Sequence, residues 1–89
     1  MPTIVFTSAL RRFLDVPQTR VDAATVGGAL AGVFTARQAL RGYVLDDQGA
    51  LRPHVAVYVN GEPVRDRTGL SDPVSDDDEI YVFQALTGG

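Results

Sequence analysis

The residues best suited to chemistry stand at the end of the sequence, which closes with Leu86, Thr87, Gly88 and Gly89. Glycine has no side chain, so these two glycines can pass through a narrow channel in a partner protein and leave the α-carboxylate of Gly89 sterically open. Chain ends are mobile unless tied down, which would let this end reach another protein's active site. A carboxylate resists nucleophilic attack until it is activated, for example as an acyl-adenylate. A frayed end or a remnant of cloning is the alternative interpretation.

Other reactive groups are scarce in this chain. Cysteine is absent, which excludes disulfides, thiolate nucleophiles, thiolate zinc sites and iron–sulfur clusters. The single histidine, His54, excludes the common metal sites built from several histidines. All basic residues are arginine, so no lysine ε-amine is offered for a Schiff base or an isopeptide bond. We therefore expect no catalytic residue, no metal site and no free-standing enzyme.

Length, composition and charge limit the number of domains and the kinds of partner that we expect for this chain. The 89 residues, 45% of them hydrophobic and 21% charged, predict one globular domain over 1–89. A net charge of −3 argues against a nucleic-acid partner. No apolar run approaches the roughly 18 residues that span a bilayer, and no basic segment precedes an apolar one at the start. We expect a cytoplasmic protein without a membrane partner.

The first half of the chain predicts a hairpin followed by a helix. β-Branched and aromatic residues predict a strand over Thr3–Thr7, and Gln18–Ala23 suits a second strand paired with it. Thr25 is a suitable N-cap for the helix that follows. Apolar residues then recur at i, i+4, i+7 and i+8, which is one helical face, and the pattern continues unevenly to Val44. That face consists of Val26, Leu30, Val33 and Phe34.

The second half predicts three more strands. Val55–Val59 has the strongest strand pattern, and Asn60-Gly61 directly after it favours a tight turn into a short return strand at Val64 and Arg65. Ile80–Phe83 predicts the last strand, with Ile80 and Val82 on one face and Tyr81 and Phe83 on the other. Leu70 and Val74 are expected to pin the intervening loop to the core.

This order of elements predicts an α+β fold. A mixed sheet of four to five strands would carry one main helix packed on one face, followed by a flexible Gly-Gly tail over residues 84–89. That arrangement is the ubiquitin-like β-grasp architecture.

Three stretches resemble the ubiquitin-like sulfur carriers, the family of the molybdopterin synthase small subunit and the thiamine-pathway sulfur carrier. They are Val57–Glu62, the spacing of Leu70, Val74 and Asp78–Ile80, and Leu86–Gly89. The stretch Val55–Arg65 also looks like the actinobacterial sulfur carrier of cysteine synthesis. The resemblance covers the chain but is sharp only from about His54 onward. The family often has prolines just before its terminal segment, where this chain has Gln84 and Ala85, which leaves the pathway open.

The resemblance implies a specific role for Gly89. A partner resembling the ubiquitin-activating enzymes would adenylate its carboxylate with ATP and magnesium, and a sulfur donor would then displace AMP and leave a thiocarboxylate. A sulfur-accepting synthase would take the sulfur into molybdopterin, cysteine or a related metabolite. The protein would bind no cofactor itself and would act as a covalent co-substrate, with Gly88 and Thr87 supporting the reactive end.

Each residue that could contact a partner also has another explanation. Tyr81, Phe83 and Leu86 either form an exposed apolar face for partners or pack in the core, and the sequence leaves both open. Asp78, in the acidic run before the last strand, could dock a basic patch, although a solvated turn is the commoner explanation. Arg65 and Arg67 could flank the terminal segment and bind a partner's acidic groups, although isolated surface arginines are commoner.

Two other functions remain open. A protein modifier would use the same activated Gly89 to form isopeptide bonds with target lysines, and would leave a ladder of conjugates in cell lysates. A non-covalent β-grasp interaction module would keep its function after Gly88 and Gly89 are deleted.

Overall fold

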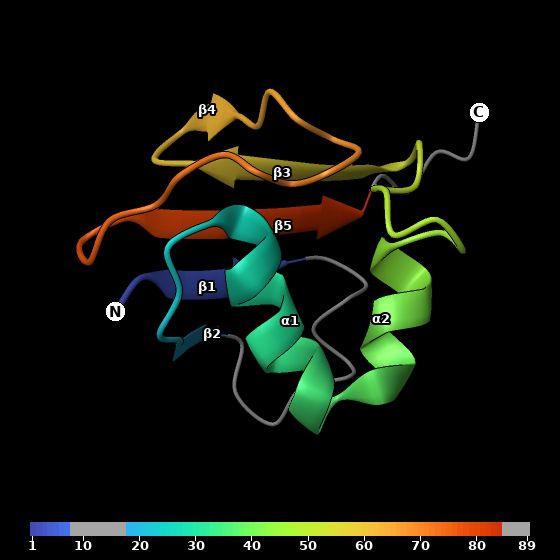
Figure 1. Cartoon of the computed structure of the whole chain (residues 1–89), viewed down its shortest axis with the longest axis horizontal. Coiled ribbons are helices and arrows are strands. Elements are labelled where there is room, and N and C mark those ends of the chain that lie inside the picture. Colours follow the sequence, from blue (N-terminus) through green and yellow to red (C-terminus); the bar gives the residue numbers. More distant parts are fainter. Residues whose placement is uncertain (8–17, 85–89) are drawn as a thin grey trace.

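The computed structural model describes residues 1–7 and 18–84. It has five strands in one sheet and two helices on one side of it (Figure 1). In chain order the elements are β1 (Thr3–Phe6), β2 (Gln18–Arg20), α1 (Val26–Ala36), α2 (Gln38–Val44), β3 (Val55–Val59), β4 (Glu62–Pro63) and β5 (Glu79–Gln84). The predicted α+β class and mixed sheet are confirmed.

Strand β5 lies at the centre of the sheet, whose order is β2-β1-β5-β3-β4. It pairs in parallel with β1, with Ile4 opposite Ile80, and antiparallel with β3, with Val57 opposite Val82. The predicted hairpin of β1 and β2 is present as an antiparallel pair. The last described element of the chain is therefore held by hydrogen bonds on both of its edges.

The core lies between the sheet and the helices. Alternate residues of the three inner strands face the helices and are almost completely buried, as strand geometry requires. These inward residues are Ile4, Phe6, Val55, Val57, Ile80 and Val82. The Leu70 and Val74 side chains, from the loop before β5, are 4% and 8% exposed, so the prediction that they pin this loop is confirmed.

Helix α1 begins and packs as its sequence predicts. The Thr25 Oγ1 accepts a hydrogen bond of 3.0 Å from the backbone N–H of Gly28, which caps the helix. The predicted apolar face is buried in the core. The prediction that one helix would continue unevenly to Val44 is wrong, because the backbone leaves helical geometry at Arg37, with φ −133° and ψ 69°. This break lets α2 turn and bury both Leu40 and Val44.

The turn after β3 has the predicted geometry, but the return strand is shifted. Asn60 and Gly61 both have positive φ, 52° and 87°, as a tight hairpin turn requires. A two-residue turn places Glu62 opposite Val59, so β4 is Glu62–Pro63 and not the predicted Val64 and Arg65. Proline lacks an N–H and suits this edge position.

The end of β5 also differs slightly from the prediction. Gln84, expected to begin the tail, is paired with Val55 as the last residue of the strand. The other tail residues, 85–89, lie outside the described residues. Within the described ranges, no helix is long and apolar enough to cross a membrane, and no cluster of three or more potential metal ligands occurs.

Two helical glycines predict opposite responses to alanine. A Cβ on Gly27 would lie 3.1 Å from the Leu70 carbonyl oxygen, which already accepts the Gly27 N–H at 2.9 Å. A Cβ on Gly42 would meet nothing within 4 Å. Gly42→Ala should raise the free energy of unfolding by roughly 0.5–1 kcal/mol through helix propensity, whereas Gly27→Ala should lower it by about 1 kcal/mol or more through overpacking. Urea unfolding of both variants checks this, and equal stabilisation would contradict the close contact at Gly27.

Candidate functional site

An aromatic cluster covers the side of the sheet that faces away from the helices. It consists of Tyr58 on β3 and Tyr81 and Phe83 on β5, which the strand register brings together. Tyr58 lies directly opposite Tyr81, and Phe83 is two residues further along the same face. The Phe83 and Tyr58 ring centroids are 5.7 Å apart at 86°, and the Phe83 and Tyr81 centroids are 6.3 Å apart at 19°.

The structure resolves the open question about Tyr81 and Phe83. Their neighbours Ile80 and Val82 fill the core, so the two aromatic residues point outward. Phe83 is 36% exposed, and Tyr58 and Tyr81 are each partly buried. The Phe83 ring contacts both tyrosine rings, and together they form a preformed apolar surface of the kind that serves protein recognition.

The aromatic cluster stands at the end of the sheet where the chain continues toward its terminal glycines. Phe83 immediately precedes Gln84, the last described residue. Four other predicted site residues lie outside the described residues, namely Leu86, Thr87, Gly88 and Gly89. A firmly paired strand thus leads directly from the aromatic cluster into the segment that ends in Gly89.

Arg67 braces the place where β5 ends. Its Nη2 donates to the carbonyl oxygens of Arg52 at 2.8 Å and Val55 at 2.7 Å. Val55 is the partner of Gln84 in the sheet. The guanidinium therefore fixes the start of β3 and, through it, the exit of β5. Sequence reasoning considered Arg67 only as a contact for a partner's acids, because nothing in the local sequence signals two carbonyl oxygens that are 12 and 15 residues away.

Asp78 is placed far from the aromatic cluster. It precedes β5, so the length of that strand, about 20 Å for six residues, separates it from the chain exit. Its carboxylate accepts the Ser75 N–H and the Asn60 Nδ2–H, each at 2.8 Å. These hydrogen bonds lower the pKa of Asp78. Its role in the described structure is to close the turn before β5.

Arg65 lies beside the edge strand β4, and β3 separates that strand from β5. Its side chain is exposed, while its backbone N–H donates to Asp72 Oδ2 at 2.9 Å. Asp72 also accepts the Asp66 N–H at 2.9 Å, and the two backbone donors lower the pKa of Asp72. The structure brings Tyr81 and Phe83 together but leaves Asp78 and Arg65 outside the aromatic cluster.

Asp66 organises the loop that carries Leu70. Its carboxylate accepts the Ser71 hydroxyl at 2.6 Å and the Gly69 N–H at 2.8 Å, with longer bonds from the Ser71 and Thr68 N–H groups. The Ser71 hydroxyl, followed by the backbone donors, lowers the pKa of Asp66 to about 2. This carboxylate holds a loop in which Leu70 takes a positive φ of 55°.

Comparison with known proteins identifies a matching family and similar proteins. The model of the ThiS family matches residues 7–89. Small archaeal modifier protein 3 of Haloferax volcanii is 35% identical over 68 residues, which cover 76% of this chain and 73% of the relative. Small archaeal modifier protein 1 of the same organism is 37% identical over 73 residues, 79% of each chain.

Solved structures share the whole architecture. The crystal structure of SAMP1 from Haloferax volcanii matches with a TM-score of 0.84 and 31% identity, over 99% of this chain and 98% of that one. The Amycolatopsis orientalis BexX/CysO complex contains a chain that matches with a TM-score of 0.86 and 26% identity over the full length of both. These matches confirm the predicted β-grasp fold.

The lowered pKa values predict acid sensitivity. Asp66 has a folded-state pKa of about 2 against a usual value of 3.8. A depressed carboxyl pKa stabilises the fold above the unfolded pKa, and this contribution is lost as the pH falls from about 4 toward 2. Asp66→Asn should reduce stability at neutral pH and flatten the decline between pH 4 and 2, measured by urea unfolding. The exposed Asp77→Asn is the control, and a decline as steep in Asp66→Asn as in the parent would contradict this assignment.

Proposed function

We propose, from the premise that this chain belongs to the ThiS family of ubiquitin-like sulfur carriers, that it carries sulfur as a thiocarboxylate on Gly89. The Gly89 carboxylate would attack the α-phosphate of ATP in an activating enzyme and release pyrophosphate. A sulfur nucleophile would then attack the acyl carbon and expel AMP. Two glycines at the reactive end leave the acyl carbon open to both steps.

The observation that carries this proposal is the position of β5. This strand is paired on both edges and anchored by Ile80 and Val82, which have no exposed surface. It leads to a terminal segment whose two glycines would fit a narrow channel of an activating enzyme. The family consists of carriers and modifiers that are not enzymes, in keeping with a chain that acts as a covalent co-substrate.

The aromatic cluster is the proposed docking surface for the activating enzyme. Phe83 stands one residue before Gln84, the last described residue. An enzyme that binds the terminal segment would therefore contact the aromatic cluster as well. Aromatic residues in mutual contact are typical of the few residues that dominate binding energy. ATP and magnesium would bind to the enzyme and not to this chain.

A sulfur-accepting synthase is the second proposed partner. Among the structural relatives, CysO was solved together with BexX, which supports the expectation that a carrier of this shape is presented to another protein. The acceptor would lie in the biosynthesis of molybdopterin, cysteine or a related metabolite. The same aromatic cluster would then serve two partners in turn.

A second function is favoured by the relatives named small archaeal modifier proteins. In a modifier, a target's lysine amine would attack the activated acyl carbon and form an amide in place of the thiocarboxylate. The absence of lysine in this chain means that it could not itself accept a second copy through an ε-amine. A single activated tail could support both functions.

Mass spectrometry of the intact chain tests the carrier function. Incubation with the cognate activating enzyme, ATP, magnesium and sulfide should produce a mass gain that corresponds to the exchange of one oxygen for one sulfur. Deletion of Gly88 and Gly89 should abolish the gain. An unchanged mass, with an enzyme that is active on another carrier, would contradict the proposal, and a ladder of covalent conjugates without any thiocarboxylate would favour the modifier.

Phe83→Ala tests the docking surface. Removing the exposed ring should weaken binding to the activating enzyme roughly tenfold or more, since central aromatic contacts dominate interfaces. Tyr43→Ala is the matched control, because Tyr43 is similarly exposed, at 41%, but lies on α2 behind the sheet. Affinity is measured by titration calorimetry and folding by circular dichroism. Equal affinities of both variants would exclude the aromatic cluster as the docking surface.

A further inference from the structure

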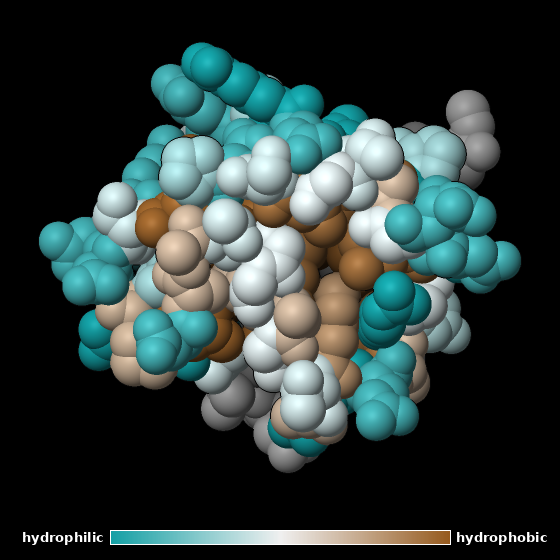
Figure 2. Space-filling model, in the orientation of Figure 1, coloured by the Kyte–Doolittle hydropathy of each residue, from teal (hydrophilic) through white to brown (hydrophobic). Residues whose placement is uncertain are grey.

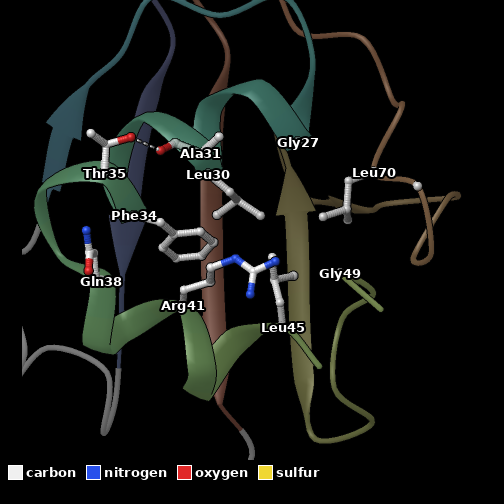
Figure 3. Close-up of a pocket in the computed structure, with 11 residues that line it drawn as sticks. Gly27, Leu30, Ala31, Phe34, Thr35, Gln38, Arg41, Leu45, Gly49 and Leu70 are labelled. Atoms are coloured by element: carbon white, nitrogen blue, oxygen red, sulfur yellow. Dashed lines mark hydrogen bonds between the residues drawn. The ribbon is translucent and has the colours of Figure 1, made fainter. Parts of the chain in front are cut away.

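A groove opens on the helical side of the molecule, on the opposite side from the aromatic cluster. It has a volume of about 660 Å³ and runs between α1 and α2 and the loops after α2 and before β5. Figure 2 shows hydrophobic surface at the bottom of this hollow, with paler and hydrophilic residues around it. Its apolar lining comes from Leu30, Phe34, Leu45 and Leu70, which Figure 3 shows around a common space.

Glycines line parts of the groove and add no side chains to its walls there. Gly49 follows α2 with a positive φ of 83°, and a Cβ there would meet nothing within 4 Å. Gly27 lines the opposite wall on α1, where Leu70 approaches too closely to leave room for a side chain. A groove with such walls admits a thin extended chain with one apolar side chain more readily than a helix.

Arg41 is the single charged residue in the described lining of the groove. Figure 3 shows its guanidinium between Phe34 and Leu45, over the apolar lining. No carboxylate of the described part of the chain forms an ion pair with this guanidinium. An apolar floor with one uncompensated cation fits an occupant that has an aliphatic side chain and one anionic group.

We propose that this groove binds the C-terminal segment Ala85–Gly89 of a second copy of the chain. The segment has one branched aliphatic residue, Leu86, and no charged side chain. Two glycines and the Gly89 carboxylate follow it, at a spacing that an extended chain covers in about 10 Å. Leu86 would fill the apolar floor and the carboxylate would pair with Arg41. The proposal rests on the proposed function, in which Gly89 carries a free carboxylate.

We assign the segment to a second copy because Gln84 is held in the sheet by its pairing with Val55. Leu86 follows Gln84 by only two residues, a span of about 7 Å. That span is shorter than the roughly 10 Å diameter of the helices between the sheet and the opening of the groove. A tail from another molecule meets no such limit. The association is head-to-tail, and it withholds the Gly89 carboxylate from activation when the protein is concentrated.

Nuclear magnetic resonance with a synthetic tail tests the proposal without ATP or an activating enzyme. Acetyl-Gln-Ala-Leu-Thr-Gly-Gly with a free carboxylate is added to the ¹⁵N-labelled full chain, up to about 5 mM because short segments bind weakly. Amide shifts should change at Leu30, Phe34, Leu45, Gly49 and Leu70. The same peptide with a C-terminal amide should bind at least about fivefold more weakly, since the charge-assisted bond is lost.

Arginine variants assign the contact. Arg41→Gln should bind the acid and amide peptides equally, and Arg41→Lys should restore part of the difference. Arg65→Gln, an exposed arginine beside β4, is the matched control and should bind like the parent. Equal binding of the acid and amide peptides by the parent, shifts confined to the aromatic cluster, or no shifts would overturn the proposal.

Dilution separates the second copy from the chain's own tail. Groove shifts of the full chain should depend on its concentration, and a chain lacking residues 85–89 should not show this dependence. Shifts that differ between the two chains but do not change with concentration would place the chain's own tail in the groove and overturn the two-copy assignment. A peptide that binds the groove of a chain that never forms a thiocarboxylate would refute the proposed function while leaving the groove assignment standing.

Discussion

The double pairing of β5 is the constraint on which the rest of the structure depends. The strand lies between β1 and β3, so its inward residues Ile80 and Val82 are completely buried. Burial of each such side chain contributes roughly 1.5–3 kcal/mol to stability. Because side chains alternate along a strand, fixing these two residues inward forces Tyr81 and Phe83 outward. The burial of Ile80 and Val82 therefore determines how the core packs, where the aromatic cluster lies and in which direction the chain leaves the sheet.

Polar groups outside the core hold the loops that frame β5. Asp66 and Asp72 bind backbone donors of the loop before β5, and Asp78 closes the turn that leads into it. Arg67 acts at the other end of the strand through the start of β3. These groups are partly exposed, so they act by hydrogen-bond geometry and not through buried charge. The acidic composition that argues against nucleic-acid binding thus has a structural use in this fold.

The sequence predicts elements best where its local chemistry is unambiguous. Thr25 as a helix cap, the Asn60-Gly61 turn and the inward pattern of Ile80 and Val82 all depend on neighbouring residues, and all are confirmed. The helix break at Arg37 was missed, because the apolar pattern continues across it and only tertiary packing favours the change in direction. The shift of β4 follows from the length of the turn, because a two-residue turn places Glu62 opposite Val59.

The site was predictable to a lesser degree. The outward direction of Phe83 follows from strand alternation, whereas its contact with Tyr58 depends on a register across 25 residues. The brace by Arg67 and the groove beneath Arg41 arise from segments brought together only by the fold. Residue type alone predicts a reactive end of the chain, which lies outside the described residues, but it could not separate Arg65, which lies apart from the aromatic cluster, from Arg67.

The proposed function requires that the aromatic cluster and the end of β5 act together as one surface for the activating enzyme. Cross-saturation transfer from the unlabelled enzyme to the labelled chain measures which side chains lie in the interface. We expect loss of signal at Tyr58, Tyr81 and Phe83, with α1 and α2 unaffected. Loss of signal on the helices, with the three aromatic rings unchanged, would contradict it.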